Sequence, residues 1–244
     1  MQAIIGKKIG MTQLLNNQGN FIPCTVIEAG PCVVTQVKTQ DKHGYKAIQI
    51  GFGDTVEKGY SKAYIQNFKK NNLPIKKVLR EVRLNPEEEF QIGQEIKADV
   101  FKAGDLLDIQ GTSIGHGFAG GMKRWGWKGG PESHGSMHHR RVGSIGASSF
   151  PSRVFRGQRM PGHMGDATVT VQNLEVIRVD VASNVIVVKG AVPGSDNGLL
   201  MLRRSLKQPL GVKPKMAPKK SEKKDPLKAS KQAAAGKGGA AKKK

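Results

Sequence analysis

Five of the six histidines of this chain lie between residues 112 and 165, where they could bind a metal, transfer protons or contact phosphate. His134, His138 and His139 have no cysteine nearby, and the single acid of the stretch is Glu132. The glycines around them disfavour a helix that would bring His134 and His138 together as metal ligands. Hydrogen bonds from imidazole to phosphate or ribose are therefore favoured over a metal site, which stays the alternative.

The same stretch contains fragments of two enzyme motifs. Serines stand near the histidines, but no nucleophile elbow or companion acid accompanies them, which argues against Ser–His catalysis. Gly115, Gly117 and Gly120 spell G-x-G-x-x-G after an expected strand. Further glycines argue against the helix that dinucleotide binding requires, and no acid follows about 20 residues later. We predict no enzyme activity, no cofactor, no metal and no small-molecule substrate.

Two tryptophans alternate with cations in the middle of this stretch. Trp125 and Trp127 are interleaved with Lys123, Arg124 and Lys128. A half-buried strand is one interpretation of this alternation. Because few apolar residues surround the indoles, we favour their stacking on nucleic-acid bases, with the cations on nearby phosphates.

Residues 112–165 as a whole have the length of a small domain without the composition of one. They include 13 glycines and few branched apolar residues, too little to bury a core in isolation. Apolar-rich runs flank them at 106–110 and 168–179, so we expect a long basic loop inserted between two strands. Such long loops in compact domains are usually functional or disordered.

The charge of the chain is concentrated in two segments. The net charge is +21; the insertion carries +7 and residues 203–244 carry +13, which leaves about +1 for the rest. Basic segments of this kind are typical of proteins that bind a polyanion. A uniformly charged surface would be expected for solubility alone, and the amphipathic helix of a membrane-surface binder is absent from the sequence pattern. We therefore predict a nucleic-acid partner and no membrane.

Short apolar segments punctuated by Gly, Pro and Asn predict a mainly β protein, as an antiparallel barrel or sandwich. The expected strands are 2–5, 11–15, 21–28, 32–39, 45–52, 106–110, 168–172, 174–180 and 185–189. Helix-like spacing at 58–71 and 74–83 predicts a small helical insertion. The expected organisation is a discontinuous barrel domain (1–55 and 98–210), the helical insertion (56–97), the long loop (112–165) and a disordered Lys-rich tail (211–244).

The compartment is predicted from what the sequence contains. Cys24 and Cys32 are the only cysteines, which suits two free thiols in a reducing cytosol. No apolar run reaches the ~18 residues that span a bilayer. The first ten residues show no signal-peptide or transit-peptide pattern. We expect a cytoplasmic protein.

Several runs of the sequence resemble the family of large-subunit ribosomal protein three, in its bacterial form. They are the opening IIGKKIGMTQ, the segments SHGSMHHRRVGSIG and RVFRGQRMPGHMG, the closing NVIVVKGAVPG, and the spaced signature Phe101, Asp108, Gly111, Ser113, Gly115, His116, Gly117, Gly120 and Arg124. The resemblance covers about residues 1–205. It implies a translation-factor-like β-barrel, with a loop running toward the peptidyl transferase centre.

The resemblance also implies a structural role in the ribosome. It implies primary binding to large-subunit ribosomal RNA, nucleation of subunit assembly, and neighbouring large-subunit ribosomal proteins as partners. We place residues 152–165 at the inner end of the loop. An RNA-modifying enzyme and a DNA-compacting protein are the rival interpretations. The candidate RNA-binding residues are Ser113, His116, Lys123, Arg124, Trp125, Trp127, Lys128, His134, His138, His139, Arg140, Arg141, Arg153, Arg156, Arg159 and His163.

Overall fold

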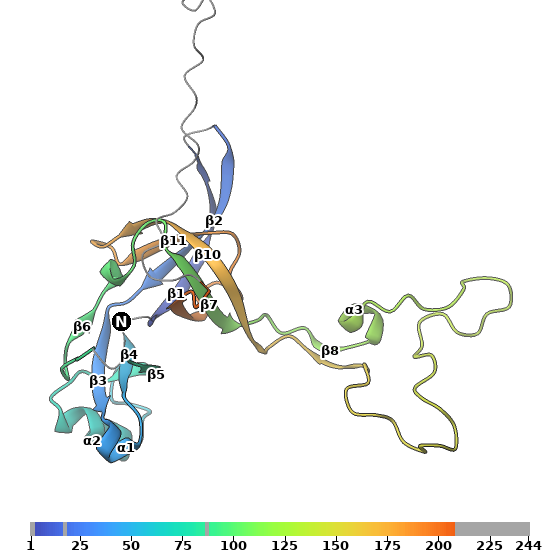
Figure 1. Ribbon diagram of the computed structural model, residues 1–244, viewed down its shortest axis with the longest axis horizontal. Coiled ribbons are helices and arrows are strands. Elements are labelled where there is room, and N and C mark those ends of the chain that lie inside the picture. Colours follow the sequence, from blue (N-terminus) through green and yellow to red (C-terminus); the bar gives the residue numbers. More distant parts are fainter. Residues whose placement is uncertain (1–2, 17–18, 86–87, 208–244) are drawn as a thin grey trace, which may run out of the picture. The chain divides into compact units, whose positions relative to one another are not determined.

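The computed structural model describes residues 3–16, 19–85 and 88–207 (Figure 1). Strands dominate this part of the chain and its helices are short, which confirms the prediction of a mainly β protein. The expected Lys-rich tail, 211–244, lies outside the described residues, so its disorder stays a prediction.

Six strands close into an antiparallel barrel. Around the barrel they follow one another as β1 (Ala3–Leu15), β12 (Leu199–Arg204), β7 (Leu106–Thr112), β10 (Thr168–Asp180), β11 (Val185–Lys189) and β2 (Phe21–Ala29), with β2 returning to β1. β12 was not among the expected strands. Because β7 and β10 pair directly, the insertion leaves and re-enters the barrel through neighbouring strands.

Glycine does not interrupt β1, where the sequence predicts two short strands. One 13-residue strand runs from Ala3 to Leu15, with a bulge between Lys8 and Gly10. A Cβ on Gly6 would lie 2.7 Å from the carbonyl oxygen of Glu28, closer than real contacts allow. Gly6 is therefore needed for close packing between barrel strands rather than for a turn.

β10 likewise joins two strands that the sequence predicts as separate. The register with β7 shifts between Val171 and Leu174, which marks a bulge in a continuous strand. Asn173 lies in this bulge with a φ of 59°, and its N–H donates to Oδ1 of the buried Asp108 at 2.9 Å. Asp108 thus satisfies a backbone donor that the irregular ladder leaves free.

A second sheet combines strands that come before and after residue 56, where the sequence predicts a domain boundary. Its order is β5 (Lys76–Arg83), β4 (Ala47–Asp54), β3 (Cys32–Lys38) and β6 (Glu95–Ile96). The helix expected at 74–83 is therefore wrong, because this segment pairs along its length with β4. The helices in this region are α1 (Gln40–His43), α2 (Lys62–Lys70) and the 3-10 turn η1 (Ala98–Val100). Only α2 matches the helical expectation.

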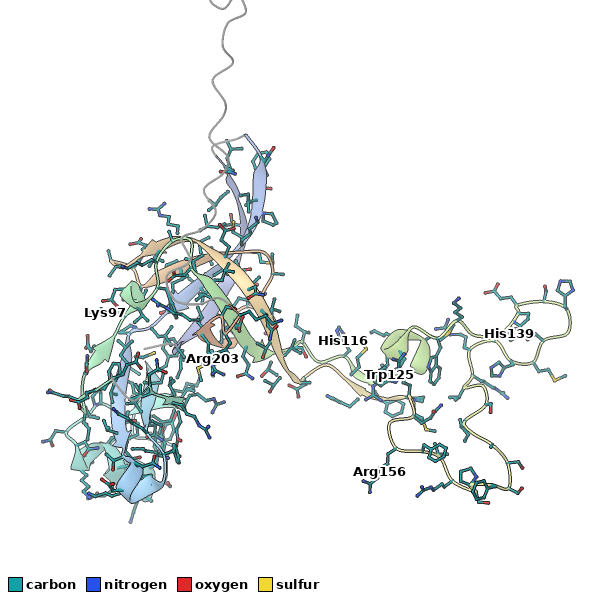
Figure 2. The ribbon with its side chains drawn as sticks, viewed as in Figure 1. Lys97, His116, Trp125, His139, Arg156 and Arg203 are labelled. Carbon is teal, nitrogen blue, oxygen red and sulfur yellow. The ribbon has the colours of Figure 1, made fainter. Side chains whose placement is uncertain are left out.

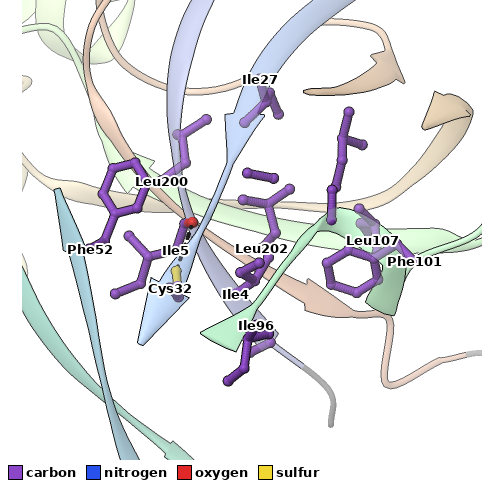
Figure 3. Close-up of a cluster of buried hydrophobic side chains, with 14 of the residues drawn as sticks. Ile4, Ile5, Ile27, Cys32, Phe52, Ile96, Phe101, Leu107, Leu200 and Leu202 are labelled. Atoms are coloured by element: carbon purple, nitrogen blue, oxygen red, sulfur yellow. Dashed lines mark hydrogen bonds between the residues drawn. The ribbon is translucent and has the colours of Figure 1, made fainter. Parts of the chain in front are cut away.

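One apolar cluster joins the two sheets (Figure 3). Ile4, Leu107 and Leu202 come from the barrel, whereas Ile96 and Phe101 come from the second sheet and the segment that follows it. The packing of buried aliphatic side chains is the main source of stability in such a core.

The core predicts a clear contrast between two leucines. Leu202→Ala removes a fully buried side chain, so we expect the free energy of unfolding to fall by about 2–5 kcal/mol. Leu206→Ala makes the same chemical change at a side chain that is 76% exposed, and we expect a change within about 0.5 kcal/mol. Denaturant titration checks both, and equal losses would contradict this description of the core.

Both cysteines are free, in agreement with the sequence prediction, and both are also buried. The Cys32 thiol donates to the carbonyl oxygen of Ile5 at 3.4 Å. Burial raises the pKa of Cys32 from 9.0 to about 11, so its reactive thiolate is scarce at neutral pH.

Candidate nucleic-acid interface

The insertion begins as a two-stranded stalk that continues β7 and β10. The N–H of Ser113 donates to the carbonyl oxygen of Ala167 at 2.9 Å, and Ser113 Oγ accepts from the N–H of Ala167 at 3.2 Å. Farther along, β8 (Gly117–Ala119) pairs antiparallel with β9 (Gly162–Met164). The Ser113 hydroxyl therefore helps to hold the stalk together, whereas the sequence predicts it as an RNA contact.

The stalk includes part of the segment that the sequence analysis places at the inner end of the loop. Residues 162–164 form β9 and lie opposite β8. Gly165 has a φ of 76°, and a Cβ there would lie 2.1 Å from the carbonyl oxygen of Ile114. Backbone contact between the two arms therefore requires glycine at this position.

A short helix follows β8, which corrects the expectation that glycines prevent one. α3 spans Gly121–Trp125 and ends at Gly126, which has left-handed backbone geometry with a φ of 71°. A Cβ on Gly121 would lie 1.9 Å from the ring of Trp127. Gly121 is therefore the surface on which Trp127 packs, and five residues remain too short for a dinucleotide-binding helix.

Two side chains of α3 bind one backbone oxygen on the returning arm of the insertion. The guanidinium of Arg124 and the indole N–H of Trp125 each donate to the carbonyl oxygen of Met160 at 2.8 Å. Arg124 and Arg159 also lie over the Trp125 ring, at 4.9 and 5.5 Å from its centroid. We call Arg124, Trp125, Arg159 and the Met160 carbonyl the latch. It joins residues some 35 positions apart in sequence.

Beyond the latch, the chain folds back to form an open polar cavity of about 500 Å³. The backbone is close-packed beside it, because a Cβ on Gly129 or Gly130 would lie 2.1–2.2 Å from the carbonyl oxygens of His139 and His138. The residues that line the cavity are Trp127, Gly129, His138, Arg141, Val142, Gly143, Ser144, Gly157, Gln158 and Arg159. Two guanidinium groups and an indole in one cavity are suited to a phosphate with its base.

His116 and His139 lie far apart along the insertion (Figure 2). His139 Nδ1 lies 3.1 Å from the carbonyl oxygen of Pro131, and the backbone N–H of His116 donates to Met164 at 2.8 Å. His163 is exposed and lies opposite Phe118 in the stalk. Within residues 3–16, 19–85 and 88–207, no group of three His, Cys, Asp or Glu side chains is placed to hold a metal ion.

Most cations of the insertion are exposed and free of acidic partners. Within the described part of the chain, the ion pairs all lie outside residues 112–165. Arg153 lies over the Phe155 ring at 5.7 Å. The exposed cations are Lys123, Lys128, Arg140, Arg141, Arg153, Arg156 and Arg159. Positive charge that the chain itself does not neutralise is available to an anionic partner.

Comparison with known proteins places this arrangement in a family. The family model described as ribosomal protein L3 matches residues 80–184, which include α3 and the whole insertion. The chain is also 50% identical over 206 residues to the large ribosomal subunit protein uL3 of Heliobacterium modesticaldum. That match covers 84% of this chain and 98% of the relative. The chain belongs to the ribosomal protein L3 family.

Membership of the L3 family confirms the predicted class of protein. Its members are structural, non-enzymatic constituents of the large ribosomal subunit, so this chain is a component of that subunit and of cytoplasmic ribosomes. Among the described residues, no helix is long and apolar enough to cross a membrane. The individual RNA-binding residues stay predictions.

Two features of the insertion are not predicted from the sequence. The carbonyl oxygen of Met160, which accepts both latch hydrogen bonds, has no sequence signal because every residue carries one. Phe118 is 81% exposed opposite His163. An aromatic residue among glycines was the available signal for Phe118.

Proposed function

We propose that residues 112–165 bind large-subunit ribosomal RNA and that this binding nucleates assembly of the subunit. The observation that carries the proposal is the set of exposed insertion cations without acidic partners, seven of them in a segment whose single acid is Glu132. Each phosphate that such a cation neutralises releases condensed counterions, which favours binding.

The local geometry supports separate roles for different parts of the insertion, some holding its two arms together and others contacting RNA. The stalk and latch hold the two arms together through backbone pairing and through Arg124 and Trp125. Arg140, Arg141 and Arg156 remain exposed for phosphates, because planar guanidinium groups suit phosphate oxygens. The cavity beside Trp127 provides an aromatic surface on which a base can stack.

Limited proteolysis tests the proposal on the intact chain. Exposed arginines in an irregular segment are good trypsin sites, so we expect the free protein to be cut first at 140–141 and 153–159, apart from the tail. Large-subunit ribosomal RNA should suppress the insertion cuts at least about tenfold, whereas unrelated RNA should protect less at physiological salt. Equal cutting with and without ribosomal RNA would contradict the proposal.

We further propose that residues 160–164 support ribosomal RNA near the peptidyl transferase centre. The resemblance stated from the sequence suggests this location, and the structure supplies a supporting feature. The Met160 carbonyl is fixed by the latch, while His163 two residues into β9 is exposed beside Phe118. The role is positional, because no acid–base pair accompanies His163 in the insertion.

Replacing His163 should therefore affect peptide-bond formation rather than the presence of the protein in subunits. For His163→Ala we expect a severalfold change in peptidyl-transfer rate, or in sensitivity to drugs bound at that centre, in subunits of normal composition. The matched control is His43→Ala, in α1 of the second sheet. Normal rates and normal responses to every such drug would contradict this placement.

A further inference from the structure

The far end of the β1–β2 hairpin has no neighbouring strand in the described structure. β12 pairs with β1 only over Ala3–Lys7, and β11 pairs with β2 over residues 24–28. Residues 11–15 pair only with residues 21–25 of β2, and residues 21–23 pair only with residues 13–15 of β1, apart from one hydrogen bond from the Gly190 N–H to the Pro23 carbonyl oxygen. We call residues 11–15 and 21–23 the hairpin arm. A two-stranded hairpin with open edges is marginally stable in water.

One face of the hairpin arm carries three exposed apolar side chains, with the exposed polar Gln13 between two of them. Side chains two residues apart on a strand share a face, so Met11 and Leu15 lie on the same side. Leu15 is directly opposite Phe21 in the antiparallel register, which places Phe21 on that side too. Met11 is 53% exposed, Leu15 64% and Phe21 68%. Three large apolar side chains therefore share one uncovered face.

The hairpin arm also lacks charge in an otherwise strongly basic chain. No Lys, Arg, Asp or Glu occurs from residue 9 to residue 27, although the chain carries a net charge of +21. Exposed edge strands are normally protected by charged residues, which keep other strands from pairing with them. The absence of protecting charges indicates that a partner covers this surface in the functional assembly.

The same absence of charge favours a protein partner over an RNA partner. A surface that docks on RNA neutralises phosphates with Lys and Arg, as the insertion is built to do. The centres of protein–protein interfaces are instead poor in charge and rich in aromatic residues and Met. The hairpin arm exposes Met11, Leu15 and Phe21, and no cation occurs between residues 9 and 27. This is the composition of a protein–protein interface.

We propose that the hairpin arm docks on the apolar surface of a neighbouring protein of the large ribosomal subunit. The inference extends the proposed function, in which the insertion takes the RNA, by assigning a protein partner to a different part of the same chain. The arm's open edges also allow the partner to add a strand to the hairpin.

Site-specific photocrosslinking inside assembled subunits tests the proposal. A benzophenone amino acid is placed at Leu15 or at Phe21. In parallel it is placed at Phe118 of the insertion and at Val56, an apolar residue that is 71% exposed in the loop after β4. We expect both arm positions to crosslink to one and the same large-subunit protein. Crosslinks from the arm only to ribosomal RNA, only to a second copy of this chain, or to nothing would overturn the proposal.

The Phe118 position separates this inference from the proposed function. A crosslink from Phe118 to ribosomal RNA, with no protein crosslink from the arm, would leave the proposed function standing and overturn the inference. A protein crosslink from the arm, with none to RNA from Phe118, would support the inference and count against the proposed function.

A double variant measures what the contact contributes. L15T with F21T introduces β-branched threonines, which suit strands, and removes two of the three apolar side chains of the face. V56T with V181T removes two exposed apolar side chains elsewhere. Unfolding midpoints of the free proteins show whether each variant folds. We expect the arm variant to lower the amount of the crosslinked neighbour in purified subunits at least about threefold, with no change in the control. Unchanged occupancy in the arm variant would contradict docking.

Discussion

Replacement of Arg140, Arg141 and Arg156 by glutamine should weaken binding to large-subunit ribosomal RNA by at least about a hundredfold. All three side chains are exposed, and none takes part in the latch. Each lost phosphate contact removes roughly 1 kcal/mol, so three remove about two orders of magnitude in affinity. The log–log slope of affinity against salt should also fall by about 2 units. Filter binding across a salt series measures both quantities.

The matched control removes the same number of charges from another part of the chain. Lys58, Lys62 and Lys102 are exposed and lie outside the insertion, so their replacement by glutamine lowers the net charge equally. We expect a loss of affinity no larger than about tenfold from this long-range effect. If the two triple variants lost affinity equally, net charge rather than the insertion would account for RNA binding.

The second large effect is expected at the latch. Trp125→Ala removes the hydrogen bond to Met160 and both cation–π contacts, with Arg124 and Arg159. These contacts together contribute about 2–3 kcal/mol to joining the two arms. We therefore expect the variant to enter large subunits at least about tenfold less often than wild-type protein when both are expressed together. Quantitative mass spectrometry of purified subunits measures the ratio.

Trp125→Phe is the informative companion variant. It keeps an aromatic ring for Arg124 and Arg159 but removes the indole N–H that donates to Met160. We expect an intermediate defect in subunit entry. Should Trp125→Ala compete as well as the wild type, the latch would have no role in assembly.

The sequence predicts those parts of the fold whose local pattern agrees with their surroundings. β11 matches its expected range of 185–189, because a run of β-branched residues this short favours a buried strand over a helix. The segment 76–83 is wrongly predicted as helix, since its Lys, Arg and Glu residues favour helices in isolation. Pairing with β4 overrides that preference, which only the tertiary structure shows.

Glycine misleads sequence reasoning in this protein for a physical reason. At Gly6 and Gly121 it lets another group approach closely, a barrel carbonyl in one case and the Trp127 ring in the other. The chain does not turn at either glycine. A prediction that treats glycine as a helix or strand breaker therefore wrongly divides β1 into two strands and wrongly excludes α3. Glu28 is distant from Gly6 in the sequence, and Trp127 lies beyond the end of α3, so the local sequence pattern does not identify either approaching group.

For the candidate interface, sequence reasoning predicts the segment better than its internal contacts. Charge and glycine content identify residues 112–165 as one unit, and the structure shows that unit joined to β7 and β10. The latch depends on a backbone carbonyl, at Met160, and on two side chains some 35 residues away. Such a contact follows from the path of the chain and not from residue types.

Directed hydroxyl-radical cleavage from the insertion tests the central claim most directly. Both native thiols are buried, and burial raises the pKa of Cys32, so a cysteine introduced at an exposed site is the one that reacts with an iron chelate. The sites are Phe155, which is 60% exposed in the insertion, and Val181, which is 48% exposed in the turn after β10.

Large subunits assembled with each labelled protein are then assayed for cuts in their ribosomal RNA. We expect radicals from position 155 to cut ribosomal RNA strongly, with cuts that include nucleotides of the peptidyl transferase region, and radicals from position 181 to cut a different and peripheral set. Cleavage from position 155 that is absent, or that matches the pattern from position 181, would contradict an insertion that binds RNA and extends toward the reaction centre.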